Sequence, residues 1–448
     1  MGNKNKIVLL FLALGMISLN ACKKDEKEGN EIPTKTPVVG DESMSNIGFS
    51  KSITHSSNLN SEYPTFMNGN GIVWASSPNP SRIKFAELTS NYVVSGDITE
   101  IIENTGALSG PNDIDLTGVR EEQTKDYLLA YIHGQNGSFA LKGKVFNASN
   151  TTNEDFLIEG VFLSANERPR YPKLAQNGSG DVAIVYHSSS GTSSPSQILF
   201  KTINISSEEV SPEPETGTQT GHVISGGDND ALFPSIAWNE ETNVYGVVYM
   251  IGTGNNRQIR YVAVDESGSV VNGPTTITNG NGFETQNPKI KADNDGFVVS
   301  WRDFRTIIIG DAEPIQGVPA IRLKKINSSG TTIELDGTKD IYDNSDHSLL
   351  VSNPYTIECG MYHDIVVKEE GSKYGLAFAT QTSPYQIYFS EVENSGGELT
   401  GSVQKNISNS NLVEDRIHLV EDNGNYVIFL TGQKSGGTGY EIRRLLEN

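Results

Sequence analysis

Positive charge is scarce in this chain of 448 residues, with 34 lysines and arginines against 55 aspartates and glutamates and a net charge of −21. Such a chain repels nucleic acid phosphates and anionic lipid head groups, which argues against both as partners. The sequence also lacks a Gly-rich phosphate loop, a His-Glu-x-x-His zinc motif and a Gly-x-Ser-x-Gly nucleophile elbow. No metal or cofactor is therefore predicted.

Cysteine is nearly absent, since the chain has only Cys22 and Cys359. Cys22 follows two lysines, an apolar run over residues 7–17 and the small residue Ala21. A basic start, a short apolar run and a small residue before the cut form an export signal, and the run is too short for the ~20 residues that a membrane-spanning helix needs. Cys359 is then expected to be an unpaired, buried thiol.

The segment Leu19-Asn20-Ala21-Cys22 resembles the lipobox of bacterial lipoproteins. That resemblance implies cleavage before Cys22 and acylation of this cysteine, which would anchor the chain to a membrane. The charged run over residues 23–28 resembles the surface-export signal of Bacteroidota lipoproteins. We predict a signal peptide at 1–21, an acylated cysteine and flexible tether at 22–46, and an outer-membrane lipoprotein facing the cell surface; a tether that stays in the periplasm is the alternative.

Long helical patterns are missing as well, and short β-branched and aromatic runs separated by turn residues take their place. The clearest example is Phe233–Val264, which reads as three strands at Phe233–Trp238, Val244–Tyr249 and Ile259–Val264. The same pattern of strands and turns recurs along the chain, which indicates a repeat protein.

The repeats are marked by Tyr-Pro, Phe-Pro or Asn-Pro starts at Pro64, Pro172, Pro234 and Pro288, which are 108, 62 and 54 residues apart. A period slightly above fifty, with three strong strands and a weaker fourth, predicts an all-β fold, a single β-propeller over residues 47–448 with seven four-stranded blades. The isolated strand 47–53 is expected to close the ring beside Tyr440–Leu445. Counts of six or eight blades remain alternatives.

In such a blade, the ends of second strands and the starts of first strands share one face. This places candidate ligand-binding residues together, and four more residues are candidates for catalysis if the protein is a lyase. The ligand-binding set is Arg168, Arg170, Tyr186, Trp301, Asp303, Arg305 and His363, and the catalytic set is His133, His187, Tyr249 and Arg302.

Each candidate also has a purely structural interpretation. The two catalytic histidines could bond nearby carbonyls, and Trp301-Arg302-Asp303 could be a core tryptophan beside a stapling salt bridge. The runs Asp293–Gly296 and Asn112–Asp115 have calcium-loop spacing, but a turn is favoured for both.

Two family resemblances frame the function. The repeat resembles sialidase-like propellers, although the segment Asp265–Val271 lacks the leading serine and closing aromatic of their Asp-box. The architecture also resembles that of ulvan lyases, which implies His and Tyr for proton transfer and Arg for neutralising a uronate carboxylate. Ranked first is a monomeric surface protein that binds a glycan or a protein partner; a polysaccharide lyase and a glycoside hydrolase are the alternatives.

Overall fold

The chain divides into two compact units, Met1–Thr36 and Pro37–Asn448, and all described residues lie in the second. The predicted signal peptide, Cys22 and the tether lie outside the described residues. The computed structural model describes residues 48–52, 60–67, 71–77, 82–89, 97–102, 114–118, 126–135, 138–147, 153–162, 169–189, 194–215, 219–228, 230–278, 284–304, 319–331, 342–343, 348–350, 359–368, 371–380, 386–395, 398–401, 405–406, 414–422, 424–433 and 440–447.

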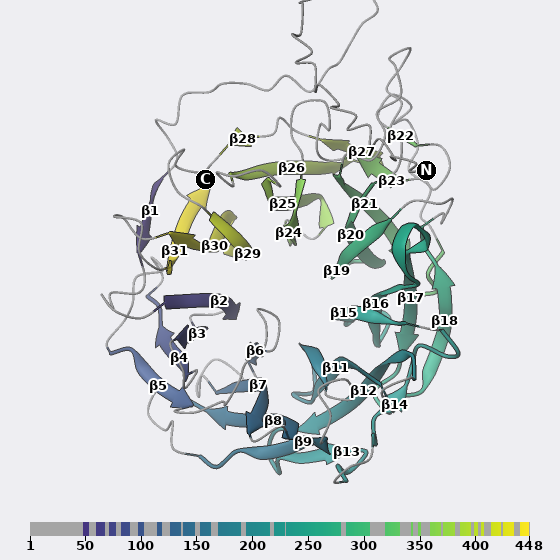
Figure 1. Cartoon of the computed structure of the whole chain (residues 1–448). Coiled ribbons are helices and arrows are strands. Elements are labelled where there is room, and N and C mark those ends of the chain that lie inside the picture. Colours follow the sequence, from purple (N-terminus) through teal and green to yellow (C-terminus); the bar gives the residue numbers. More distant parts are fainter. Residues whose placement is uncertain are drawn as a thin grey trace, which may run out of the picture. The chain divides into compact units, whose positions relative to one another are not determined.

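The described residues form a β-propeller-type fold of antiparallel sheets that follow one another in chain order (Figure 1). We number these sheets 1 to 7. Sheet 1 holds β2 (Asn60–Met67), β3 (Gly71–Ser77), β4 (Arg82–Glu87) and β5 (Thr99–Ile102). Sheet 2 holds β6 (Ile114–Gly118), β7 (Tyr127–Gln135), β8 (Ser138–Phe146) and β9 (Phe156–Phe162). Sheet 3 holds β10 (Arg170–Gln176), β11 (Val182–Ser189), β12 (Ser196–Asn204), β13 (Glu209–Ser211) and β14 (His222–Val223).

The later sheets repeat this order. Sheet 4 holds β15 (Leu232–Asn239), β16 (Val244–Ile251), β17 (Gln258–Val264) and β18 (Val270–Thr276), with a 3-10 turn at Gly254–Asn256. Sheet 5 holds β19 (Thr285–Asp293), β20 (Gly296–Asp303), β21 (Ala320–Asn327), β22 (Tyr342–Asp343) and β23 (Ser348–Leu350). Sheet 6 holds β24 (Cys359–Lys368), β25 (Lys373–Thr380), β26 (Ile387–Ser395), β27 (Glu398–Gly401) and β28 (Lys405–Asn406). Sheet 7 holds β29 (Glu414–Asp422), β30 (Asn425–Gln433), β31 (Tyr440–Glu447) and β1 (Gly48–Ser52).

The three strands predicted in Phe233–Val264 are β15, β16 and β17, and the weaker fourth strand is β18. The early strand β1 pairs antiparallel with β31 at the far end of the chain, as the sequence predicted for that segment. The predicted turn at Asp293–Gly296 is confirmed, because Asp293 pairs with Gly296 across the β19–β20 hairpin. The turn predicted at Asn112–Asp115 is wrong for Ile114 and Asp115, which belong to strand β6.

The first strands of successive sheets lie against one another, from β2 and β6 through to β24 and β29, and β29 also contacts β2. The pairing of first and second strands is interrupted by a β-bulge in six sheets, between Arg170 and Lys173 in β10, for example. In four of these, the bulge contains the X-Pro start. Proline has no N–H for the ladder, so a bulge is where a strand accommodates it.

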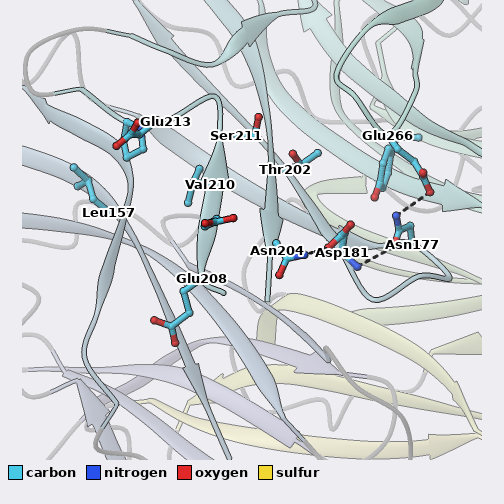
Figure 2. A pocket seen from close by; sticks show the side chains of 13 residues that line it. Leu157, Asn177, Asp181, Thr202, Asn204, Glu208, Val210, Ser211, Glu213 and Glu266 are labelled. Carbon is cyan, nitrogen blue, oxygen red and sulfur yellow. Dashed lines mark hydrogen bonds between the residues drawn. The ribbon is translucent and has the colours of Figure 1, made fainter. Parts of the chain in front are cut away.

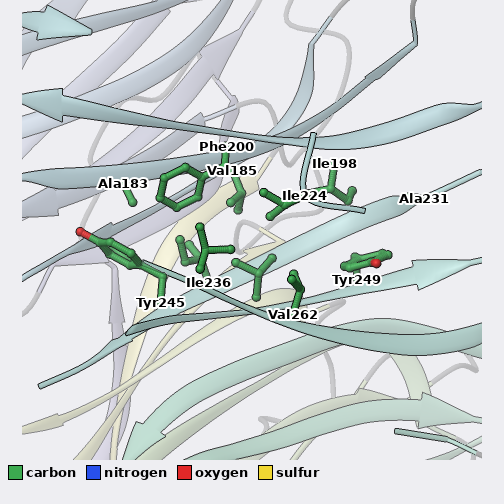
Figure 3. Packing of buried hydrophobic residues seen from close by; sticks show 13 residues of the cluster. Ala183, Val185, Ile198, Phe200, Ile224, Ala231, Ile236, Tyr245, Tyr249 and Val262 are labelled. Atoms are coloured by element: carbon green, nitrogen blue, oxygen red, sulfur yellow. The ribbon is translucent and has the colours of Figure 1, made fainter. Parts of the chain in front are cut away.

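Adjacent sheets pack face to face through a repeated exchange of one glycine and one aromatic ring. A Cβ on Gly246 would lie 2.7 Å from the ring of Phe297 in the next sheet, and a Cβ on Gly375 would lie 2.5 Å from the ring of Tyr426. Each glycine lies near the start of a second strand, and each ring comes from the second strand of the following sheet. Figure 3 shows one of the resulting apolar layers, in which Tyr245 and Tyr249 of sheet 4 pack with Phe200 of sheet 3.

None of the described residues belongs to a helix with the length and hydropathy to cross a membrane.

Candidate functional site

The X-Pro bulges force three side chains into an unusual orientation. Tyr171, Phe233 and Asn287 precede the prolines of β10, β15 and β19, and their φ angles are 54°, 54° and 52°. Left-handed φ is uncommon outside glycine and persists where the surrounding structure holds it, which is frequent at binding sites. We call the end of the sheets where first strands begin and second strands end the entry face.

On the entry face, the side chains of Tyr171, Phe233 and His187 form an aromatic cluster. The ring centroids of Tyr171 and Phe233 are 4.6 Å apart, and those of Tyr171 and His187 are 5.0 Å apart. Phe233 donates its backbone N–H to Nδ1 of His187 over 3.4 Å. Arg170 lies directly opposite His187 in the β10–β11 ladder. Tyr171 and Phe233 are both half-buried, so neither residue is fully closed off from solvent.

Sheet 5 supplies the predicted Trp301-Arg302-Asp303 run, and all three residues are buried, with Arg302 the least so at 7% exposure. Trp301 is buried and its indole Nε1 donates to Oδ2 of Asp303 over 2.9 Å. Asp303 is paired with Arg322, with Nε 3.7 Å from Oδ2. Arg302 donates to Gln286 over 3.0 Å and stacks over the ring of Phe304 at 4.4 Å. Trp301 therefore lies in the core, as the structural interpretation expected, and Asp303 bonds to neighbours within its own sheet. The salt bridge expected between Arg302 and Asp303 stays a prediction.

One position in the first strand of each of sheets 2 to 7 forms a row of polar side chains that we call the first-strand row: Asp115, Lys173, Ser235, Lys289, Asp364 and His418. Three of its members accept a hydrogen bond from the backbone of the following sheet. Asp115 accepts the backbone N–H of Leu174 at 2.8 Å, and Asp364 accepts that of Leu419 at 2.9 Å. Ser235 accepts the backbone N–H of Ile290 at 3.3 Å.

The cationic members of the row stand beside these acceptors. Nζ of Lys173 is 3.4 Å from Asp115, and Nδ1 of His418 is 3.2 Å from Asp364. Burial lowers the pKa of Lys289 to about 8, partly offset by the negative charges of Asp364 and Asp115. Because charges from three other sheets act on this one amine, the row faces a shared space.

His363 adjoins this space and is only 2% exposed. Neither ring nitrogen makes a hydrogen bond to another described residue. Burial, followed by the positive charge of Lys289, lowers the pKa of His363 to about 3. Burial alone would raise the pKa of the neighbouring Asp364, but the hydrogen bond from His418 and the charges of Lys291 and Lys289 hold it well below its usual range.

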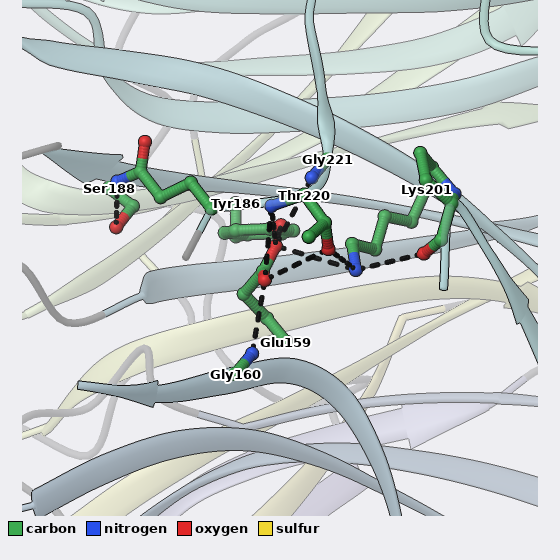
Figure 4. Close-up of polar contacts among 9 residues, drawn as sticks. Glu159, Gly160, Tyr186, Ser188, Lys201, Thr220 and Gly221 are labelled. Carbon is green, nitrogen blue, oxygen red and sulfur yellow. Dashed lines mark hydrogen bonds and ion pairs between the residues drawn. The ribbon is translucent and has the colours of Figure 1, made fainter. Parts of the chain in front are cut away.

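The side chain of Tyr186 does not join Tyr171, Phe233 and His187. It lies in a buried ionic network between sheets 2 and 3 (Figure 4). Its hydroxyl donates to Glu159, which also accepts the N–H of Gly160 over 3.0 Å and lies 3.5 Å from Nζ of Lys201. Lys201 in turn donates to the hydroxyl of Thr220 over 2.6 Å. Burial, and then the negative charge of Glu159, raises the pKa of Tyr186 well above its ordinary value. Its predicted ligand role stays a prediction.

The remaining predicted site residues do not gather at one place among the described residues. Tyr249 is buried and donates to Asp228 over 2.9 Å, while Asp228 also pairs with Arg260. Burial, and then the charge of Asp228, raises the pKa of Tyr249 far above its usual value. His133 lies in β7, opposite Ala140 of β8. Arg168 and Arg305 lie outside the described residues.

Sequence reasoning missed the residues on either side of each proline. At the prolines of β10, β15 and β19, the residue before carries the left-handed φ, and the residue after joins the first-strand row, as Lys173, Ser235 and Lys289 do. The repeated X-Pro starts were visible in the sequence and indicated where each first strand begins. They did not indicate in which direction the flanking side chains point. Within the described residues, no three His, Cys, Asp or Glu side chains gather as a metal site would require.

No family model matches the chain, and no curated protein matches it. Among solved structures, it is similar to the polysaccharide lyase Uly1, at 9% identity over 88% of this chain and 91% of that one, with a TM-score of 0.49. A protein of unknown function from Dyadobacter fermentans is 9% identical over 89% and 97%, with a TM-score of 0.45. The GH93 α-L-arabinofuranosidase of Fusarium graminearum is 10% identical over 80% and 97%, with a TM-score of 0.42. Identities this low say nothing of what this chain binds.

Proposed function

We propose that the entry face binds an extracellular polysaccharide that carries carboxylate groups. The observation that carries this proposal is the half-exposed pair of Tyr171 and Phe233, held at left-handed bulges beside His187. Exposed aromatic rings supply flat apolar area on which sugar rings can stack at low entropic cost. Arg170 and Arg302 lie at the same end of the sheets and suit a carboxylate, although the chain as a whole is acidic.

The test is affinity electrophoresis in gels that contain uronate-bearing or neutral polysaccharides. We expect retardation by the uronate-bearing gels and its loss in Tyr171→Ala and Phe233→Ala. Trp238→Leu is the matched control, because Trp238 lies near the other end of strand β15. Equal retardation of the wild type and both alanine variants on every gel would refute the proposal.

A lyase is the second candidate, and the trio of Arg170, Tyr171 and His187 favours it. A lyase needs a base for the proton next to the carboxylate, a proton donor for the leaving oxygen and a cation beside the acid. His187 and Tyr171 are 5.0 Å apart between ring centroids, and Arg170 is opposite His187 in the ladder. If the trio is catalytic, uronate polysaccharides will yield products that absorb at the unsaturated-uronate band.

We further propose that sheets 1 to 7 are seven blades of one ring, closed by the pairing of β1 with β31. The contact between β29 and β2 supports this closure. A closed ring leaves no free inner edge on which another strand could add. Acylation at Cys22 would hold this monomeric domain on the outer membrane, facing the surface. Metabolic labelling with a fatty acid, compared between wild type and Cys22→Ser, tests the anchor.

A further inference from the structure

A cavity lies at the other end of the sheets, away from the entry face. It has a volume of about 640 Å³ and opens beside the hairpin turns of sheets 3 and 4 (Figure 2). Asn177 and Asp181 come from the β10–β11 turn, and Glu266 comes from the β17–β18 turn. The β12–β13 hairpin contributes Glu208 and Glu209.

The cavity is strongly acidic. Within the described part of the chain, its lining includes five carboxylates and no lysine, arginine or histidine. Two of these carboxylates are partly engaged: Asn204 donates to Oδ1 of Asp181 over 3.1 Å, and Asn177 donates to Oε1 of Glu266 over 2.9 Å. Among the described residues, no ion pair neutralises any carboxylate of the lining. Negative charge at this density favours a cation.

A buried tyrosine provides the second, independent sign of a ligand. Tyr245 lines the cavity with 0% of its surface exposed, and its hydroxyl has no hydrogen-bond partner among the described residues. Its ring is fixed between Trp238 and Phe200, at centroid distances of 4.6 and 5.6 Å. Burial, followed by the negative charges of Glu266 and Asp181, raises the pKa of Tyr245, and all three residues line the same cavity. A buried polar group without a partner is uncommon in folded proteins and calls for one.

The arrangement fits an extended organic cation better than a metal ion. The lining carboxylates do not meet in a group of three that could hold a metal within the described residues. They are spread along the cavity, from Glu213 at one side to Glu266 at the other (Figure 2). Leu157, Val210 and Pro214 supply apolar surface among them. Methylene groups can rest on such surface while ammonium groups reach the carboxylates.

We propose that this cavity binds a linear chain that carries two or more protonated amines. One amine lies between Asp181 and Glu266 and donates to the hydroxyl oxygen of Tyr245, and the others contact Glu208, Glu209 or Glu213. Either a free polyamine or a lysine-bearing segment of another protein has this chemistry.

The test is isothermal titration of the full chain with spermidine and, in a second arm, with trilysine at physiological ionic strength. We expect saturable binding of at least one of the two at a single site. Tyr245→Phe, Asp181→Asn and Glu266→Gln should each weaken it about tenfold, the usual effect of one lost charged hydrogen bond. Asp97→Asn and Glu393→Gln remove the same charges at exposed positions in other sheets and should change nothing.

Tyr245→Phe separates a binding role from a folding role, because the phenyl ring keeps its packing against Trp238 and Phe200. The variant should remain at least as stable as the wild type and lose affinity only. Equal weakening in the control variants would show diffuse attraction to an acidic protein and overturn the proposal. So would an absence of saturable binding, or a calcium ion that displaces spermidine and depends on the same three residues.

Discussion

The rings of Tyr171 and Phe233 come from successive sheets, and their centroids lie 4.6 Å apart. Each residue precedes a proline and has a left-handed backbone. Two equivalent bulges therefore deliver two aromatic side chains to one place, where neither sheet alone would make a platform.

Replacing Tyr171 by phenylalanine separates binding from lyase chemistry. Tyr171→Phe keeps the stacking ring but removes the hydroxyl that a lyase would use as its proton donor. We expect unchanged retardation in uronate-bearing gels and, if the protein is a lyase, loss of at least about a hundredfold in rate, as for the loss of a general acid. Tyr171→Ala should lose both. A Tyr171→Phe variant with full lyase activity would exclude this hydroxyl as the donor.

Binding of a carboxylate-bearing ligand should weaken as the pH rises through about 8, because that is where Lys289 loses its charge. Lysine is charged below its pKa, so the attraction is complete at lower pH and declines above it. Asp115, Asp364, Lys173 and Lys291 face the same amine. The measurement is an affinity titration from neutral to alkaline pH. Lys289→Arg should keep its affinity across this range, and an identical decline in Lys289→Met would show that another group titrates.

The buried imidazole of His363 should lower the free energy of unfolding in acid. The unfolded chain binds a proton at the usual histidine pKa of 6.5, whereas the folded protein does so only at about 3. Protons thus favour the unfolded chain between these values, and stability falls as the pH is lowered through that window, by a few kcal/mol at most. Urea unfolding at several pH values measures it.

The matched variants are His363→Leu and His222→Gln. His363→Leu should flatten the dependence between pH 6.5 and about 3, leaving the separate loss below the usual value of 3.8 that comes from protonation of Asp364. His222→Gln alters an exposed histidine and should reproduce the wild-type curve. A curve for His363→Leu as steep as that of the wild type would show that a group other than His363 causes the pH dependence.

Gly246→Ala should destabilise the protein by about 1–3 kcal/mol, the usual cost of overpacking a core. The added methyl group would lie 2.7 Å from carbons of the Phe297 ring, which is fully buried and cannot withdraw. Gly227→Ala is the control, since a Cβ there meets no atom within 4 Å. Denaturant midpoints compare the two. A Gly246→Ala variant as stable as Gly227→Ala would mean that the sheets can separate locally.

Removal of one member of the buried pair formed by Glu159 and Lys201 should be costly. Lys201→Met leaves the carboxylate buried without its cation, for which we expect a loss of about 3–5 kcal/mol in unfolding free energy. The double variant Glu159→Gln/Lys201→Met should lose less than the sum of the single changes, because no lone charge is left behind. Additive losses would argue that the two side chains do not interact. Both side chains are fully buried, so glycan retardation should persist in the folded variants.

The site was only partly predictable. The predicted strand pattern placed Arg170 and His187 at one end of neighbouring strands, and in the structure the two residues lie opposite each other in the β10–β11 ladder. The same reasoning grouped Tyr186 and Tyr249 with them, yet these hydroxyls reach Glu159 and Asp228 instead. A strand pattern assigns a residue to an end of the sheet, but which neighbour its side chain contacts depends on the sheet packed beside it.

The sequence by itself determined the all-β class, the repeat and most strand positions, because local alternation and turn residues set these features over a few residues at a time. Only the tertiary structure decided that Asp364 and Asp115 tie one sheet to the next, and that Phe297 fills the space left by Gly246. It also decided that the hydroxyl of Tyr245 has no hydrogen-bond partner among the described residues, in a cavity that Glu266 also lines. Those relations join residues from different sheets or separate turns. Their energies depend on burial and on charge at distances that no local pattern encodes.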